Sequence, residues 1–258
     1  MEAKYIELPL YRDGETHPAT VNAAIPSLFI YPAQQPSGKA IIMCPGGGLT
    51  KVAMEHEGHD MAPWFIEQGI TFAILKYRMP NQQENILSED IRQAIRTMRS
   101  LSGKYCFKEL GVMGASIGGY IAASAAVFPE ADTCPDFQIL FYPVISMKQA
   151  YTHIPSRTQI LGEHPSVWKE NDFSLECHVK DNTPKAFIAA ASDDKAVSPV
   201  NSTLYYDALL KHGVSACLHI YPEGGHSFAF RDTFPYKTLL LKELKAWLSQ
   251  SQSNGLAI

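Results

Sequence analysis

The sequence has no excess of positive charge. Its 22 Lys and Arg residues are outnumbered by 26 Asp and Glu residues, which leaves a formal net charge of −4. Proteins that bind nucleic acid usually carry a basic patch or stripe, so no nucleic-acid partner is expected. No stretch approaches the roughly 18 apolar residues that a membrane-spanning helix requires, and no membrane partner is expected either.

Secretion signals and paired cysteines are also missing. Residues 1–15 contain no basic region followed by an apolar run, so no signal peptide is expected and a cytoplasmic location is favoured. The cysteines are odd in number, and none is spaced as C-x-x-C. They are expected to be buried free thiols. They are Cys44, Cys106, Cys134, Cys177 and Cys217.

Short apolar runs alternate with helix-like segments along most of the 258 residues. Strands are predicted at residues 39–44, 70–75, 110–115, 137–142, 186–191 and 216–221. Helices are predicted at residues 60–68, 88–102, 117–128, 199–212 and 235–248. In the second helix Ser88 is a candidate N-cap, and apolar residues follow at helical spacing.

The predicted strands are continuous apolar runs, which is typical of strands covered by helices on both faces. Strand–helix alternation predicts a doubly wound, mostly parallel α/β sheet. Two extended pieces, at residues 5–10 and 27–31, predict an antiparallel N-terminal edge. Residues 153–181 are polar and irregular, and we expect a short cap-like insertion there. The whole chain, residues 1–258, is predicted to be one domain.

Gly114-Ala115-Ser116-Ile117-Gly118 has the form G-x-S-x-G and lies between a predicted strand and a predicted helix. In this context a serine lies on a sharp turn that exposes its hydroxyl group as a nucleophile. A glycine-rich packing turn is the alternative interpretation. The position of the motif favours catalysis by Ser116.

A nucleophilic serine needs a histidine base and an acid, which follow it along the chain in folds of this kind. His226 lies in a glycine-flanked loop after the last predicted strand, where it can reach back across the sheet. The preceding predicted strand, residues 186–191, is followed closely by Asp193 and Asp194, and both qualify as the acid. The other of the two aspartates would hydrogen-bond loop amides, an ordinary role for Asp in a turn.

Three consecutive glycines, at positions 46–48, follow the predicted strand at residues 39–44. Bare backbone amides can turn toward a substrate carbonyl and stabilise the oxyanion of a tetrahedral intermediate. Gly47 and Gly48 are the predicted donors from this loop, with Ile117 supplying a third amide after the nucleophile. A phosphate-binding loop is not favoured, because Lys51 does not have the spacing of G-x-x-x-x-G-K-[ST].

With these segments in place, the chain resembles the α/β-hydrolase superfamily, and in particular its bacterial acetyl-xylan-esterase-like branch, also described as xylanase B-like or lipase/esterase. The resemblance covers about residues 35–250 and implies an α/β-hydrolase fold. The D-x-x-V form that is usual in this family favours Asp194 as the acid. The departures are Ala115 and Ile117 in the nucleophile turn, and Pro45 where lipase-type relatives carry a histidine. The matching segments are residues 41–48, 57–58, 77–78, 114–119, 142–144, 192–197 and 221–228.

The resemblance implies a serine esterase that cleaves small carboxylic esters without a metal or another cofactor, with acetyl groups on xylo-oligosaccharides or other sugars as a candidate substrate. A general short-chain carboxylesterase, a lipase-like enzyme or a peptidase-like hydrolase would use the same triad. A non-catalytic binding protein of the same fold would normally lack one triad member. Residues 55–60 contain H-E-x-H, which departs from the H-E-x-x-H zinc motif, and a polar helix start is favoured there. The sequence is compatible with a homo-oligomer.

Overall fold

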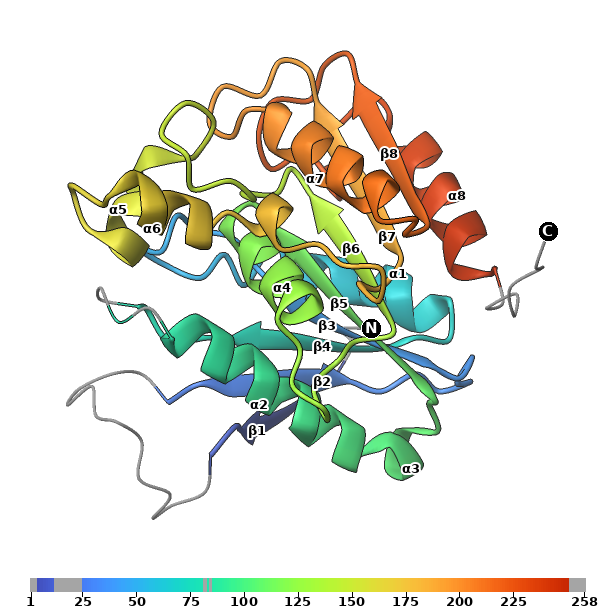
Figure 1. The fold of residues 1–258 in the computed structure, drawn as a ribbon. Helices are drawn as coiled ribbons and strands as arrows, with labels where there is room; N and C mark the ends of the chain where they lie inside the picture. Colours follow the sequence, from blue (N-terminus) through green and yellow to red (C-terminus); the bar gives the residue numbers. More distant parts are fainter. Residues whose placement is uncertain (1–3, 12–24, 81–82, 84, 251–258) are drawn as a thin grey trace.

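The computed structural model describes residues 4–11, 25–80, 83 and 85–250. Within them, eight strands form one sheet in the order β1-β2-β4-β3-β5-β6-β7-β8 (Figure 1). The strands are β1 (Ile6–Pro9), β2 (Ser27–Tyr31), β3 (Lys39–Cys44), β4 (Thr71–Lys76), β5 (Glu109–Ala115), β6 (Phe137–Phe141), β7 (Ala186–Ala191) and β8 (Ala216–Tyr221).

The sheet is parallel from β4 to β8 and antiparallel at its N-terminal edge, where β1 pairs with β2 and β2 pairs with β4. The predicted mostly parallel sheet with an antiparallel edge is therefore confirmed. Parallel strands place their carboxyl ends at one margin of the sheet. The segments that follow β3, β5, β7 and β8 consequently meet there. They contain all the predicted site residues, including Ile117, the first residue of the helix after β5.

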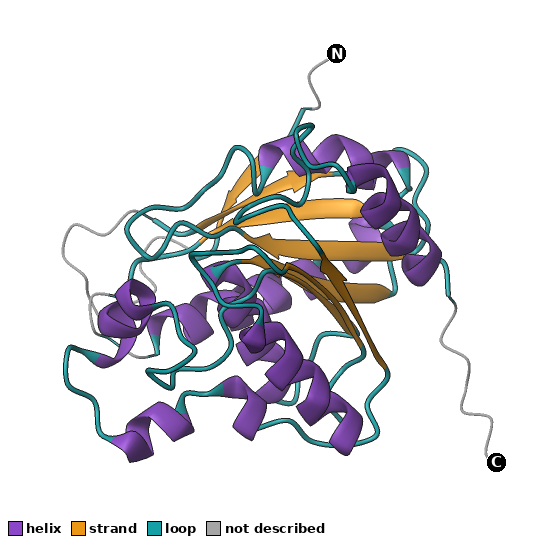
Figure 2. Ribbon diagram, turned by 90° about the horizontal axis from the view of Figure 1, so that it is seen from above, coloured by secondary structure: helices purple, strands orange, loops and turns teal. Residues whose placement is uncertain are grey.

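Helices cover both faces of the sheet, as Figure 2 shows from above. Apolar side chains of α2, α4 and α7 pack in one core cluster, and those of α1 and α8 pack in a second cluster on the opposite face. The helices are α1 (Ala62–Glu67), α2 (Ile86–Ser100), α3 (Ser102–Tyr105), α4 (Ile117–Val127), α5 (Ile154–Leu161), α6 (Val167–Asp172), α7 (Val200–Lys211) and α8 (Lys237–Leu248), with 3-10 turns η1 (His59–Met61) and η2 (Leu175–Cys177).

The start of α2 differs from the prediction. The helix begins at Ile86, and the Ser88 hydroxyl donates a hydrogen bond to the carbonyl oxygen of Asn85, 2.9 Å away. Ser88 is thus inside the first turn and does not cap the helix. The same helix carries Asp90, which is fully buried and pairs with the guanidinium of Arg78 at 2.7 Å. This buried ion pair ties α2 to the segment that follows β4.

The predicted insertion contains regular structure. Helices α5 and α6 and the turn η2 lie between β6 and β7, and Figure 1 shows the two helices side by side at one end of the molecule. An ion pair between Arg157 of α5 and Glu170 of α6 joins them. These helices were not predicted, because the segment is polar and shows little of the apolar periodicity that indicates a helix.

The five cysteines are free thiols, but they are not all buried. Cys44 lies in the core, Cys134 and Cys217 are half-buried, and Cys106 and Cys177 are exposed. The expectation of buried thiols therefore holds in full for Cys44 alone and is wrong for Cys106, which follows α3, and for Cys177, the last residue of η2. No helix within the described residues is long and apolar enough to cross a membrane.

Candidate active site

Ser116 occupies the sharp turn between β5 and α4. Its backbone angles are φ 56° and ψ −125°, a region that residues other than glycine rarely adopt. A Cβ atom on Gly118 would lie 1.9 Å from the carbonyl oxygen of Cys44, so glycine is required for the first turn of α4 to approach β3. The strand–turn–helix context that the G-x-S-x-G motif demands is present.

The structure brings together three of the residues that the sequence singles out. His226 Nε2 lies 2.9 Å from Ser116 Oγ, and His226 Nδ1 lies 2.7 Å from Asp194 Oδ2. These side chains come from the loops after β8, β5 and β7. The serine hydroxyl thus has a base within hydrogen-bonding distance, and the base has a carboxyl group on its other nitrogen, an arrangement suited to nucleophilic catalysis.

The two candidate acids have different environments. The Asp194 side chain is buried, and its Oδ1 accepts hydrogen bonds from the amides of Ala196 and Val197 at 2.9 and 3.0 Å. Asp193 is exposed, and its Oδ1 accepts the amide of Gly225 at 2.8 Å. This hydrogen bond is the main reason why the pKa of Asp193 is lowered. Asp193 therefore shapes the histidine loop, whereas Asp194 contacts the histidine ring itself.

The glycine loop after β3 lies against the serine. A Cβ atom on Gly46 would lie 2.9 Å from Ser116 Cβ and 2.6 Å from Glu57 Oε2, so the loop is wedged between these two side chains. The Gly46 amide donates to Glu57 Oε2 at 2.8 Å. Within the described part of the chain, the amides of Gly47 and Gly48 have no acceptor. They are left available for a ligand, while the Gly46 amide is not.

A buried carboxyl group supports this loop from behind. Glu57 is 1% exposed, and its Oε1 accepts the hydroxyl of Tyr142 at 3.0 Å. Burial and the neighbouring Glu57 raise the pKa of Tyr142 well above its usual value, so the hydroxyl keeps its proton and donates. The Tyr142 ring meets the His226 ring edge-on, with 5.0 Å between centroids. Glu57 and Tyr142 therefore connect the glycine loop to the histidine.

Sequence reasoning assigned no such role to Glu57 or Tyr142. Glu57 belongs to the segment whose histidines resemble a metal motif, yet both of its oxygens are used to hold Gly46 and Tyr142. The part of the chain that the structure describes contains no group of three His, Cys, Asp or Glu side chains arranged to hold a metal. An isolated acid between polar neighbours gives no sequence signal that it becomes buried.

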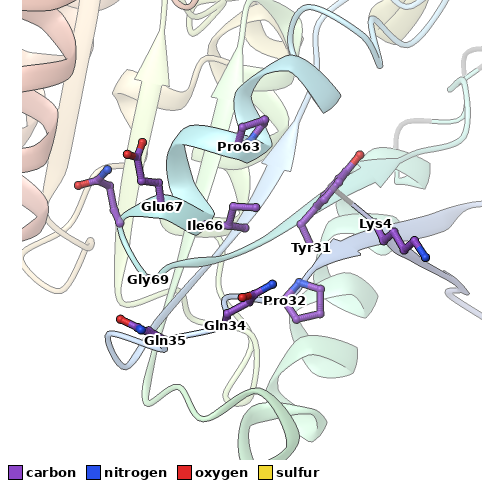
Figure 3. Close-up of a pocket in the computed structure, with 10 residues that line it drawn as sticks. Lys4, Tyr31, Pro32, Gln34, Gln35, Pro63, Ile66, Glu67 and Gly69 are labelled. Atoms are coloured by element: carbon purple, nitrogen blue, oxygen red, sulfur yellow. The ribbon is translucent and has the colours of Figure 1, made fainter. Parts of the chain in front are cut away.

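A groove of about 1220 Å³ lies elsewhere, between the end of β2 and α1. Figure 3 shows its lining, which includes Tyr31 and Ile66 and none of the predicted site residues. Tyr31 is paired with Phe72 at the start of β4, so this groove adjoins the amino ends of the parallel strands. The serine and its partners follow the carboxyl ends, where ligands bind in open α/β sheets.

Comparison with known proteins places this geometry in a family. A family model described as the prolyl oligopeptidase family matches residues 77–253, which is more than half of the 258 residues. The chain belongs to the prolyl oligopeptidase family. The matched region of this family member contains Ser116, Asp194 and His226, but the glycine loop precedes it.

Two curated relatives of this prolyl oligopeptidase family member are named after xylan-degrading activities. An acetylxylan esterase of Xylanibacter ruminicola is 34% identical over 223 residues, covering 83% of this chain and 46% of the relative. An endo-1,4-beta-xylanase B of Butyrivibrio fibrisolvens is 31% identical over 237 residues, covering 84% of this chain and 37% of the relative. The chain thus spans less than half the length of these relatives.

Solved structures match the family member over nearly its whole length. An acetyl ester-xyloside bifunctional hydrolase from Caldicellulosiruptor lactoaceticus superposes with a TM-score of 0.86 at 31% identity, covering 94% of this chain and 95% of that one. An esterase from Thermogutta terrifontis, solved with propionate, gives a TM-score of 0.74 at 19% identity, covering 95% and 93%. The predicted α/β-hydrolase fold and the resemblance to the acetyl-xylan-esterase-like branch are confirmed.

Proposed function

We propose that this chain is a serine esterase that removes acetyl groups from small sugar esters, with acetylated xylo-oligosaccharides as the substrate class. The observation that carries the proposal is the pair of hydrogen bonds on His226, 2.9 Å to Ser116 Oγ and 2.7 Å to Asp194 Oδ2. The relatives named acetylxylan esterase and acetyl ester-xyloside hydrolase support an acetyl ester as the substrate.

The first half of the reaction transfers the acyl group to the enzyme. Ser116 Oγ attacks the ester carbonyl carbon while His226 Nε2 takes the hydroxyl proton, and Asp194 stabilises the imidazolium that forms. The amides of Gly47, Gly48 and Ile117 hold the developing oxyanion. When the tetrahedral intermediate collapses, His226 gives its proton to the leaving alcohol, and an acetyl-serine remains.

The second half of the reaction restores the serine. A water molecule takes the place of the alcohol beside His226, which removes a proton as the water oxygen attacks the acetyl carbonyl. Collapse of the second intermediate returns the proton to Ser116 Oγ and releases acetate. The chain supplies every group in this cycle from its own side chains and amides.

The test compares wild type with Ser116→Ala on p-nitrophenyl acetate and on acetylated xylo-oligosaccharides. We expect wild type to release acetate from both, and the variant to lose activity by a factor on the order of 10⁴ or more. Ser100→Ala is a matched control, because Ser100 is exposed at the end of α2 and distant from the loops of the site. Equal turnover by wild type and Ser116→Ala would refute the proposal.

A second candidate activity is peptide hydrolysis, which is favoured by the match to the prolyl oligopeptidase family model. The same serine, histidine and acid cleave amides in such enzymes. Peptide p-nitroanilides distinguish the two candidates. Under the esterase proposal their kcat/KM lies far below that of the acetyl esters, and the reverse order would favour a peptidase.

A further inference from the structure

A second histidine lies beside the proposed catalytic groups, and the mechanism above does not use it. His153 immediately precedes α5, in the segment between β6 and β7. Its ring atom Cε1 lies 3.8 Å from the point where a Cβ atom on Gly48 would be. The ring therefore lies beside the glycine loop, at the last of its three glycines.

The environment of His153 also connects it to the catalytic pair. Burial lowers the pKa of His153, the charge of His226 lowers it further, and the charge of Asp194 opposes these effects. A ring that lies beside Gly48 and is influenced electrostatically by both His226 and Asp194 is near the glycine loop and near the histidine and the acid of the site. The imidazole is neutral near pH 7, because its ordinary pKa is already about 6.5.

The position of the proton on this neutral ring follows from Ser156. His153 Nδ1 lies 2.8 Å from Ser156 Oγ, and Ser156 is fully buried. Within the described residues the Ser156 hydroxyl has no other hydrogen-bond partner. Buried hydroxyl protons are rarely left without an acceptor, so Ser156 donates to Nδ1. The tautomer of His153 therefore carries its proton on Nε2.

That Nε2–H group is directed away from Ser156. In an imidazole ring Cε1 lies between the two nitrogens, and Nδ1 is held by Ser156, so Nε2 is one bond away from the ring atom that lies near Gly48. Nε2 has no hydrogen-bond partner among the described residues, and the ring is partly exposed. The result is a partly exposed hydrogen-bond donor near the glycine loop.

The backbone around His153 holds this donor in position. The carbonyl oxygen of His153 accepts the amide of Arg157 at 3.1 Å and so begins α5. The guanidinium of Arg157 is paired with Glu170 of α6, and both side chains are largely buried. A donor fixed by such supports binds a ligand group at a lower entropic cost than one on a free side chain.

The location of the donor indicates which part of an ester it meets. In the proposed reaction the glycine loop holds the carbonyl oxygen, and His226 delivers a proton to the leaving alcohol. A donor beside the glycine loop and near His226 can meet the alcohol part of the ester. In an acetylated sugar the carbon next to the ester carries a free hydroxyl group, whereas a simple alkyl or aryl ester has none.

We propose that His153 Nε2–H donates a hydrogen bond to the sugar hydroxyl next to the scissile acetyl ester, which makes His153 a residue that selects sugar esters over simple esters. This inference rests on the proposed esterase function and names a determinant of its substrate class. His153 was not identified from the sequence, because only folding brings residue 153 against residue 48.

The experiment measures kcat/KM for mono-acetylated xylobiose and for ethyl acetate, which lacks the neighbouring hydroxyl group. The proteins are wild type, His153→Ala, His153→Gln and the control His164→Ala, whose residue is exposed in the same inserted segment. Removing one hydrogen bond costs about 1 kcal/mol, so His153→Ala is expected to lower the ratio of kcat/KM for the sugar ester over ethyl acetate by roughly fivefold or more. The change is expected mainly in KM for the sugar ester.

The glutamine variant separates hydrogen bonding from packing. Its side-chain amide nitrogen can donate from nearly the position of Nε2, so His153→Gln is expected to restore most of the ratio, and His164→Ala is expected to leave it unchanged. An unchanged ratio in His153→Ala, or no recovery in His153→Gln, would overturn this inference alone. A folded wild type that cleaves neither ester would overturn the proposed function and this inference with it.

Discussion

Replacing Asp194 with Asn tests the proposed proton relay most directly, because the structure determines which way the new amide points. Asp194 Oδ1 accepts the amides of Ala196 and Val197 at 2.9 and 3.0 Å. In Asp194→Asn the side-chain oxygen keeps these two hydrogen bonds. The reverse orientation would leave two buried donors unpaired, at about 1–3 kcal/mol each. The Asn amide nitrogen must therefore face His226.

The consequence is an imidazole with the wrong tautomer. An NH₂ group at the position of Asp194 Oδ2, 2.7 Å from His226 Nδ1, donates to Nδ1 and requires that nitrogen to be unprotonated. The proton then lies on Nε2, which cannot accept the proton of Ser116. We expect kcat to fall by a factor on the order of 10⁴, which corresponds to about 5.4 kcal/mol of transition-state stabilisation. KM is expected to change little, because Asp194 does not contact the substrate.

The assay is hydrolysis of p-nitrophenyl acetate by wild type, Asp194→Asn and Asp193→Asn, with thermal melts of all three. Asp193 is exposed and accepts backbone amides of the histidine loop, chiefly that of Gly225. Asp193→Asn is therefore expected to lower kcat less than about threefold, since exposed hydrogen bonds contribute little. The melting temperatures are expected to be similar. An Asp194→Asn variant that keeps a tenth of the activity, or a larger loss in Asp193→Asn, would refute this reasoning.

Three further outcomes follow from the buried groups. Glu57 accepts hydrogen bonds from the Gly46 amide and the Tyr142 hydroxyl, and in Glu57→Gln one of these two donors would face the new NH₂ group. We expect the free energy of unfolding to fall by about 1–3 kcal/mol and kcat to fall as well. An unchanged kcat would contradict the role of Glu57 behind the glycine loop. Asp90→Ala removes the buried carboxylate from Arg78 and leaves its guanidinium with the half-exposed carboxylate of Glu89, at 3.3 Å. Urea denaturation should therefore show a loss of about 3 kcal/mol, and a loss below 1 kcal/mol would count against it. Burial raises the pKa of Cys217 to about 11, so at pH 8 a thiol reagent should modify exposed Cys106 well before Cys217, and the opposite order would contradict the burial argument.

Much of the sheet could be predicted because its strands are apolar runs bounded by turn residues. Residues 39–44, 186–191 and 216–221 match β3, β7 and β8 residue for residue. Each of the three is a continuous apolar run bounded by turn residues, so its composition marks its limits. Strands β3 and β7 are buried along nearly their whole length, whereas β8 is mostly half-buried. Helices α5 and α6 could not be predicted in this way. Ion pairing and the surrounding fold hold them, and neither contribution appears as a hydrophobic period.

Some residues of the candidate site could be predicted from the sequence, and others could not. Ser116, His226 and the Asp193-Asp194 pair could be identified because each follows a recognisable strand and the order along the chain is restricted. Glu57 and His153 could not, since their importance depends on contacts with residues 46 and 48 that only folding creates. The choice of Asp194 over Asp193 likewise has a physical basis only in the folded structure, where two backbone amides hold Asp194 Oδ1.

The position of β8 has a consequence for how this molecule loses activity on warming. Within the described sheet β8 forms its ladder with β7 alone, and five of its six residues are only partly buried or exposed. His226 lies in the loop that follows this outermost strand, whereas Ser116 follows β5, which is paired with a strand on each side. Margins of a sheet open at lower free energy than its centre. The temperature at which activity is lost therefore depends on the stability of this edge of the sheet. We expect it to be lower than the temperature at which the helical circular dichroism signal is lost, because that signal depends on the whole sheet and its helices.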